Sequence, residues 1–503
     1  MSTARQNEDP IVSSGVPGLD DVMNGGFPRG HFFLVEGEPG AGKTTLGLQF
    51  LMAGRDRGES VLYVTLSESE REIQKVARSH GWSLEGVTIY EFMPVEDALR
   101  PERQYSAFHP SDVEFQDSMQ NILDQTERAS PTRIVLDSLS EIRLLAADAL
   151  RYRRQILALK TFFTRRNCTV LMLDDRTVSM QDGQLESIAH GVVILERIPR
   201  EYGGTRRRLQ VSKMRGTLYR EGHHDYTITT GGVEVYPRLI AAEHRTEVAQ
   251  TAISSGIPQL DALWGGGGID RGTSTLLLGP AGSGKSSVAL SYAVTAARAG
   301  DFVSMFLFEE LASLACKRAA GLGLDPRPLI QEGRIHLEQI DPAELSPGAF
   351  IQHVRDTVEK RGARVVVIDS LNGFMNAMPG EAHLALQMHE LLGYLNHRGV
   401  VSILVLSQAG LMGSAMSQPV DLSYLADNVM LFRYFEAMGR VRKALSIVKK
   451  RSGLHEDTIR ELSMSGGSIA IGEALTGFRG VLTGVPTWAG NQKELGNADG
   501  SGN

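Results

Sequence analysis

One eight-residue segment constrains the fold more than any other. Residues 37–44 read Gly-Glu-Pro-Gly-Ala-Gly-Lys-Thr, with the apolar run 32–35 before them and an amphipathic helical pattern after them. A strand, a glycine-rich loop and a helix in this order form a P-loop, in which backbone N–H groups bind phosphate oxygens at the helix N-terminus. In such a loop Lys43 contacts the β- and γ-phosphates, and the Thr44 hydroxyl binds Mg²⁺. The alternative is a glycine-rich turn that matches the motif by chance.

The same motif occurs a second time. Residues 279–286 read Gly-Pro-Ala-Gly-Ser-Gly-Lys-Ser, and Lys285 minus Lys43 gives an offset of 242. The flank repeats too, because Ser-Ser-Gly-Val-Pro-Gly-Leu-Asp at 13–20 matches Ser-Ser-Gly-Ile-Pro-Gln-Leu-Asp at 254–261. Similarity at a fixed period indicates a duplicated unit, so we predict two ATP-binding domains. The candidate ATP-binding residues are Gly37, Gly40, Ala41, Gly42, Lys43, Thr44 and Thr45, and Gly279, Gly282, Ser283, Gly284, Lys285, Ser286 and Ser287.

The length of 503 residues suits two α/β domains. Strand-like and helix-like segments alternate in each half, which predicts a mostly parallel sheet with helices on both faces and a ligand at the carboxyl ends of the strands. Short strands at 192–195, 209–211 and 226–228 predict an antiparallel extension at the sheet edge. The predicted organisation is a flexible tail (1–12), a first domain (13–240), a polar linker (241–252), a second domain (253–487) and a disordered tail (488–503).

Composition excludes several classes of function. A net charge of −7 argues against a general binder of nucleic acid or anionic membranes. Cys168 and Cys316, one in each half, form no metal cluster, and we expect both to be small buried apolar residues in a reducing cytosol. The first ten residues lack the apolar core of a signal peptide, and no apolar stretch is long enough to span a bilayer. We therefore expect a cytoplasmic protein without a membrane partner.

Two aspartates are candidates for a metal site. Asp137 and Asp369 each end an apolar strand, and each is followed by Ser-Leu. A carboxylate at this point lies beside a P-loop and can hold Mg²⁺ together with the hydroxyl of Thr44 or Ser286. The alternative is a strand-end aspartate that caps the next turn.

Acidic residues after the next strand are candidates for catalysis. Glu309 and Glu310 align at the offset of 242 with Ser67 and Glu68. A carboxylate here can accept a proton from water or a hydroxyl, so Glu309, Glu310 and Glu68 are catalytic candidates. The first site has lost one carboxylate, and the two sites are predicted to be inequivalent. The alternative is a pair of solvated acids at a helix start, where the helix dipole favours them.

A basic pair follows a strand at equivalent places in both halves. Lys213 and Arg215 match Lys449 and Arg451. Their alternating spacing puts each pair on one strand face. Such a pair can reach a γ-phosphate across a subunit interface, as arginine fingers do. The alternative is an edge strand protected from pairing by its charges.

From about residue 12 to 487 the chain resembles the KaiC family, the RecA-like double-domain ATPases of the bacterial circadian clock. The resemblance rests on Gly-Gly-Phe-Pro-Arg-Gly (25–30), Ala-Arg-Ser-His-Gly-Trp (77–82), Lys-Met-Arg-Gly-Thr (213–217), Tyr-Thr-Ile-Thr (226–229) and Phe-Glu-Glu (308–310). It implies a two-tiered homohexamer with ATP between neighbouring subunits, slow hydrolysis in the first domain, and autokinase and autophosphatase activity in the second. It also implies that the two basic pairs are trans-acting phosphate sensors and that Glu309 is the kinase base. A KaiB-like regulator or a histidine-kinase-type output partner is implied as well.

The chain departs from the clock members at the phosphoacceptors. Their adjacent Ser-Thr pair reads Ser423-Tyr424 here, and Gln418 stands where they carry another threonine. A phenolic hydroxyl lies much farther from the backbone, so Ser423 is the preferred acceptor and Tyr424 the second candidate. The tail has no apolar helix for an activating partner, and dependence on a KaiA-like protein is not expected.

The combined prediction is an ATP- and Mg²⁺-dependent homohexameric autokinase and ATPase in signalling or timing. One alternative is a RecA-like DNA-binding motor or recombinase, which would show a basic surface and DNA-stimulated ATPase activity. Another is an ATP-gated scaffold without kinase activity, which would form rings without incorporating phosphate.

Overall fold

The structure, a computed structural model, describes residues 10–92, 110–146, 148–176, 184–200, 203–376, 383–408, 424–482 and 487–488. Backbone contacts divide the chain into two units, Met1–Arg238 and Leu239–Asn503, and each is described by itself.

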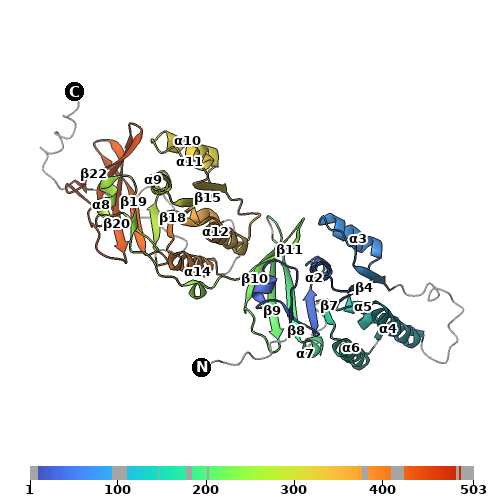
Figure 1. Cartoon of the computed structure of the whole chain (residues 1–503). Helices are drawn as coiled ribbons and strands as arrows, with labels where there is room; N and C mark the ends of the chain where they lie inside the picture. The colour runs from blue at the N-terminus through green and yellow to red at the C-terminus, as the bar shows by residue number, and fades with distance from the viewer. Residues whose placement is uncertain are drawn as a thin grey trace, which may run out of the picture. The chain divides into compact units, whose positions relative to one another are not determined.

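The first unit, blue to green in Figure 1, is built on a nine-stranded sheet. In spatial order its strands are β11 (Gly232–Tyr236), β10 (His223–Thr229), β9 (Arg206–Met214), β8 (Gly191–Ile198), β3 (Phe32–Gly37), β7 (Thr169–Asp175), β6 (Arg133–Asp137), β4 (Val61–Thr65) and β5 (Thr88–Glu91). The six strands from β8 to β5 are parallel, and β9, β10 and β11 are antiparallel. The predicted fold class is therefore confirmed. One detail was wrong, because β8 was assigned to the antiparallel extension. A crossover connection returns the chain beside β3 in the same direction, so the extension begins at β9.

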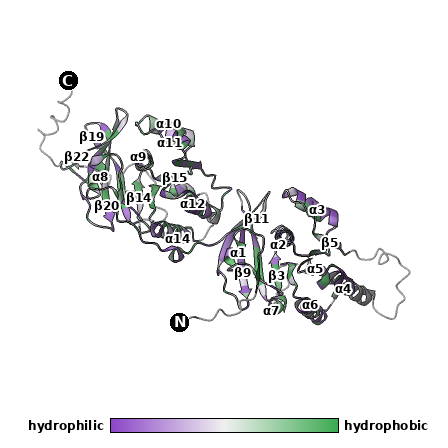
Figure 2. Cartoon of the chain, in the orientation of Figure 1, coloured by the Kyte–Doolittle hydropathy of each residue, from purple (hydrophilic) through white to green (hydrophobic). Residues whose placement is uncertain are grey.

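Helices cover both faces of this sheet. They are α1 (Leu19–Val22), α2 (Lys43–Arg55), α3 (Glu70–Ser79), α4 (Pro110–Ala129), α5 (Leu139–Ala146), α6 (Ala149–Arg165) and α7 (Gln184–Ile188). Along β3, Phe33 and Val35 join one core cluster with α2 and α3, whereas Phe32 and Leu34 join a second cluster with α4 to α7. The two-residue period of a strand explains this division. In Figure 2, α3 carries hydrophilic and hydrophobic residues side by side, as a helix with one buried face does.

The second unit, yellow-green to red in Figure 1, has the same strand order. Its strands are β16 (Ile335–Gln339), β15 (Phe302–Leu307), β17 (Ala363–Asp369), β18 (Val401–Ser407), β14 (Ser274–Gly279), β19 (Asn428–Ala437), β20 (Arg440–Lys450), β21 (Arg460–Ser465) and β22 (Ser468–Ala474). Its helices are α8 (Pro258–Leu263), α9 (Lys285–Arg298), α10 (Ala312–Ala320), α11 (Arg327–Gln331), α12 (Pro347–Arg361), α13 (Leu371–Asn376) and α14 (Leu384–His397). β14 therefore corresponds to β3 and β18 to β7, and the repeat seen in the sequence is a repeat of the whole fold.

Smaller elements lie around the two sheets. Three short antiparallel pairs are β1 (Ile11–Val12) with β2 (Phe27–Pro28), β12 (Ala252–Ile253) with β13 (Ile269–Asp270), and β23 (Phe478–Arg479) with β24 (Thr487–Trp488). Residues 11–12 of the predicted tail thus form a strand, and Ala241–His244 of the predicted linker form a 3-10 helix. Cys168 and Cys316 are free and buried, as predicted. Within the described residues, no helix has both the length and the apolar character that crossing a membrane requires.

Candidate nucleotide-binding sites

The first P-loop connects β3 to α2 at the carboxyl end of the parallel strands. Gly40 and Gly42 have φ values of 78° and 98°, which favour glycine. A Cβ atom on Gly42 would lie 2.7 Å from Cδ1 of Ile228, so this position also lacks space for a side chain. Ala41 and Thr45 are buried beneath the loop. Because α2 begins at Lys43, its first backbone N–H groups face the loop, an arrangement that fits a phosphate.

Lys43 is held by three oxygen atoms. Its side chain is 8% exposed, and Nζ donates to the carbonyls of Gly37 (2.8 Å) and Glu38 (3.2 Å) and to Oδ1 of Asp175 (2.6 Å). Asp175 ends β7 and pairs in register with Gly37. The sequence analysis missed Asp175, although two acids directly follow the strand pattern at 169–173. A strand-end acid beside a P-loop was a signal that could have been noticed.

Asp137 lies at the other end of the loop. Its Oδ2 accepts hydrogen bonds from Oγ1 of Thr44 at 2.8 Å and from Oη of Tyr63 at 2.5 Å. Burial raises the pKa of Asp137, and the two hydroxyl donors oppose that shift. A carboxylate beside a hydroxyl at the start of a P-loop helix offers the oxygen ligands that Mg²⁺ prefers, so the residues present fit this ion. Tyr63 was not predicted, because a buried tyrosine within an apolar strand gives no signal of its own.

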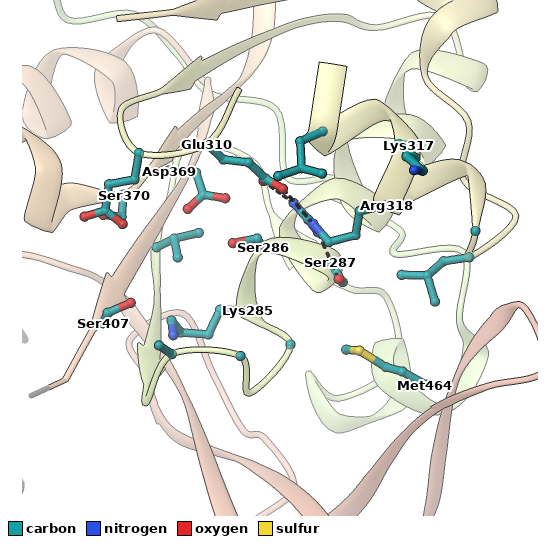
Figure 3. Close-up of a pocket in the computed structure, with 18 of the residues that line it drawn as sticks. Lys285, Ser286, Ser287, Glu310, Lys317, Arg318, Asp369, Ser370, Ser407 and Met464 are labelled. Carbon is teal, nitrogen blue, oxygen red and sulfur yellow. Dashed lines mark hydrogen bonds and ion pairs between the residues drawn. The ribbon is translucent and has the colours of Figure 1, made fainter. Parts of the chain in front are cut away.

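The second P-loop borders a cavity of about 770 Å³. Of its predicted residues, Gly282, Gly284, Lys285, Ser286 and Ser287 line this cavity, whereas Ser283 is buried beneath the loop. Figure 3 shows Ser286 beside Asp369, and Lys285 on the side of Ser407.

Lys285 is bonded to carbonyl groups. Its Nζ donates to the carbonyls of Gly279 (2.9 Å) and Pro280 (2.8 Å). Burial lowers the pKa of Lys285 to about 8. Burial likewise raises the pKa of Asp369, and a hydrogen bond with Ser286 opposes that shift. This Ser286–Asp369 pair offers Mg²⁺ the same kinds of oxygen atom as Thr44 and Asp137 do in the first domain.

Glu309 and Glu310 both line this cavity but have different environments. Glu310 accepts hydrogen bonds from Nη2 (2.6 Å) and Nε (3.2 Å) of Arg318, whose Nη1 donates to Oγ of Ser287 (3.0 Å), as Figure 3 shows. Glu309 is exposed to the cavity and makes no side-chain hydrogen bond within the described residues. Its carboxylate is therefore available to accept a proton, whereas that of Glu310 is held by α10. Arg318 was missed in the sequence, where nothing distinguishes it from other charged helix residues.

The first domain has the same backbone at this point. The N–H of Leu66 donates to the Asp137 carbonyl, and that of Phe308 donates to the Asp369 carbonyl. Ser67 therefore corresponds to Glu309 and Glu68 to Glu310, as the offset of 242 predicts. Partial burial, followed by the charge of Asp137, raises the pKa of Glu68.

The first basic pair lies at the opposite edge of the sheet from its own P-loop. Met214 pairs with Gly191, which lies beside Phe33 near the start of β3. The loop begins four residues later, about 13 Å along the strand. Lys213 donates to the carbonyls of Glu186 (2.5 Å) and Ala189 (2.8 Å), and Arg215 to that of Ser187 (2.8 Å), so both reach the α7 segment.

The second basic pair has the same relation to its sheet. Lys449 donates to the Ala426 carbonyl at 2.7 Å. Arg451 contacts Oδ1 of Asp427 and the carbonyl of Tyr424, both at 3.2 Å. Tyr424 precedes β19, which starts at the amino end of the parallel strands, and its side chain is 57% exposed. Ser423 lies outside the described residues.

Comparison with known proteins identifies the family. The family model described as ATPase: KaiC matches residues 12–240 and 253–476. The circadian clock oscillator protein KaiC of Parathermosynechococcus lividus is 26% identical over 492 residues, which cover 95% of this chain and 88% of that protein. The circadian clock protein KaiC3 of Synechocystis sp. is 25% identical over 487 residues, with coverage of 95% and 94%. The chain therefore belongs to the KaiC family of ATPases, with one copy of the ATPase domain in each half.

Proposed function

We propose that this protein is an ATP-dependent homohexameric ATPase and autokinase of a signalling or timing system. The observation that carries the proposal is the separation of parts within the second domain. The P-loop lysine, Asp369 and Glu309 line one cavity, whereas Lys449, Arg451 and Tyr424 lie toward the opposite edge of the same sheet. An acceptor at that edge cannot reach the Glu309 of its own chain, so transfer requires a neighbouring copy.

In the proposed reaction Glu309 accepts the proton of the Ser423 hydroxyl from a neighbouring subunit. The hydroxyl oxygen then attacks the γ-phosphorus of ATP, the bond to the β–γ bridging oxygen breaks, and ADP leaves. Lys285 binds the β- and γ-phosphates, while Ser286 and Asp369 hold Mg²⁺. When bound, Mg²⁺ neutralises charge that develops on the phosphate oxygens. Tyr424 is the second candidate acceptor, because its phenol is exposed next to Ser423.

The first domain is proposed to hydrolyse ATP slowly. It has a P-loop, Asp137 and Glu68, but Ser67 replaces the residue that corresponds to Glu309. Hydrolysis there rests on Glu68 as the general base, with its raised pKa closer to neutrality.

The ring and the timing role are proposed from the basic pairs and the relatives. Residues at one edge of a domain complete the site at the opposite edge of the next copy, a head-to-tail contact that closes into a ring. A phosphoserine adds about −1.5 to −2 charges beside Lys449 and Arg451 and can reorganise that contact. Relatives named as circadian clock proteins make a clock-like output reasonable, with a KaiB-like regulator or a histidine-kinase-type protein as partner.

The decisive experiment maps phosphorylated residues after incubation with Mg²⁺-ATP. We expect phosphate on Ser423 or Tyr424 in wild-type protein, and labelling reduced by about 10²-fold or more in Glu309→Gln. Ser423→Ala should remove most of the label if this residue is the main acceptor. Mixing Glu309→Gln with a Ser423→Ala/Tyr424→Phe variant tests transfer between subunits, because only mixed rings can then be labelled.

Native mass measurements with and without ATP test the ring in parallel. Rings without any label would refute the kinase and leave an ATP-gated scaffold. ATPase activity stimulated by DNA would instead favour a RecA-like motor.

A further inference from the structure

The two P-loops differ in the residue that ends the neighbouring strand. In the first domain the N–H of Arg176 donates to the Gly37 carbonyl, and in the second the N–H of Gln408 donates to the Gly279 carbonyl. The residue before each is therefore equivalent, namely Asp175 in the first domain and Ser407 in the second. The backbone is the same at both sites, but one carries a carboxylate and the other a neutral hydroxyl.

This difference changes what the P-loop lysine is bonded to. Lys43 makes an ion pair with Asp175 at 2.6 Å, in addition to its two carbonyl contacts. Lys285 has the two equivalent carbonyl contacts, and among the described residues no carboxylate lies within ion-pair distance of it. The contrast is thus confined to one side chain beside an otherwise matched lysine.

The neighbouring acids of the first domain have other partners. Asp174 forms an ion pair with Arg143 and accepts a hydrogen bond from Ser140. Asp137 is bonded to Thr44 and Tyr63. Asp175 is the acid that takes the positive charge of Lys43, and a third of its side chain is exposed. It therefore lies at the rim of the loop, where the terminal phosphate of a nucleotide is expected.

We propose that Asp175 lowers the preference of the first site for ATP over ADP, relative to a site with a neutral residue at this position. Lys43 contacts both the β- and the γ-phosphate in a P-loop, so a bound γ-phosphate competes with the carboxylate for the lysine. The γ-phosphate also brings negative charge next to Asp175, and like charges repel. ADP has no γ-phosphate, and Lys43 can serve its β-phosphate while it keeps Asp175. The second site, with Ser407, has neither cost.

This inference rests on the proposed binding of ATP at the first P-loop, and its test separates the two. The full-length chain is first restricted to one site by Lys285→Ala, which removes the second P-loop lysine. Calorimetry then gives the Kd values of ADP and of a non-hydrolysable ATP analogue, both with Mg²⁺. The same titrations are repeated with Asp175→Ser, which copies the second domain, and with Asp175→Asn, which keeps the size of the side chain and removes its charge.

We expect both Asp175 variants to raise the ratio of triphosphate to diphosphate affinity by about tenfold, a change of about 1.4 kcal/mol. The reciprocal change, Ser407→Asp in a Lys43→Ala chain, should lower this ratio at the second site by a similar factor. Equal shifts in Asp175→Ser and Asp175→Asn would assign the effect to charge and not to space. An unchanged ratio in both would overturn the inference while leaving ATP binding intact. A Lys285→Ala chain that binds neither nucleotide would refute the proposed first site itself, and the inference with it.

Discussion

In the first domain the groups that would receive a nucleotide are already engaged by side chains, and in the second they are much less so. Lys43 is bonded to Asp175 and Asp137 to Tyr63, whereas Lys285 is bonded to backbone carbonyls. Met305 occupies the position of Tyr63, since both lie two residues before the strand end that pairs with the aspartate. A nucleotide must displace or rearrange more side-chain contacts at the first site.

The layer beneath the loops differs in the same sense. Glu36 and Asp174 are neighbours across β3 and β7, and their counterparts across β14 and β18 are Leu278 and Leu406. Burial, and then the charges of Glu186 and Asp174, raise the pKa of Glu36 to about 7. The first domain thus carries ionisable groups at two positions where the second is apolar. The comparison teaches that a duplicated fold can keep its backbone while the charges around each phosphate site diverge.

The largest expected effect concerns Ser67 and Glu309. Exchanging the two residues tests whether this position makes the two sites unequal. Glu309→Ser should slow chemistry at the second site by roughly 10²- to 10⁴-fold, the contribution of a general base. In a Lys285→Ala chain, Ser67→Glu should accelerate hydrolysis at the first site, measured as phosphate release under saturating ATP.

Ser67→Gln is the control for the second experiment, because it has the size of glutamate without its basicity. An unchanged rate in Ser67→Glu would mean that Glu68 already supplies the base. The inequality of the two sites would then have to come from another residue.

A pH-dependent effect on stability is expected from Glu36. Its pKa is raised in the folded state from about 4.5 to about 7, so folding is favoured by the proton that Glu36 holds. The contribution is full below pH 4.5 and is lost as pH rises through 7. The loss amounts to at most about 3 kcal/mol in the free energy of unfolding. Denaturant unfolding at pH 5 and pH 8 measures it, and Glu36→Gln should reduce the difference between the two.

Glu36→Leu, which copies Leu278, is the matched control and should behave like Glu36→Gln at pH 8. If wild type and Glu36→Gln lose the same stability between pH 5 and pH 8, Glu36 is not the group responsible.

The smallest expected effect is that of Tyr63→Phe. The substitution removes a buried hydrogen bond to Asp137 and should lower the free energy of unfolding of the first domain by about 2 kcal/mol. It should also raise the pKa of Asp137 further, because a donor to its charged form is lost. Thermal unfolding measures the first effect. Met305→Leu in the second domain is the control, and an equal loss there would show that packing and not the hydrogen bond is responsible.

Much of the architecture followed from local sequence. The two P-loops, the alternating apolar segments and the offset of 242 predicted two parallel α/β sheets, and the structure has them. Periodicity cannot give the direction of a strand, so β8 was assigned to the antiparallel extension although it runs parallel to β3. Only the crossover that precedes it decides that direction.

The sequence by itself determined the fold class, the duplication and the chemistry of the P-loops, because each depends on residues close together in the chain. The tertiary structure alone decided which distant side chains meet there. Asp175 reaches Lys43 from 132 residues away, and Tyr63 reaches Asp137 from 74 residues away. Strands far apart in sequence lie about 5 Å apart in a sheet, so their end residues converge on one loop. No local pattern records that convergence, and it is where the two domains differ.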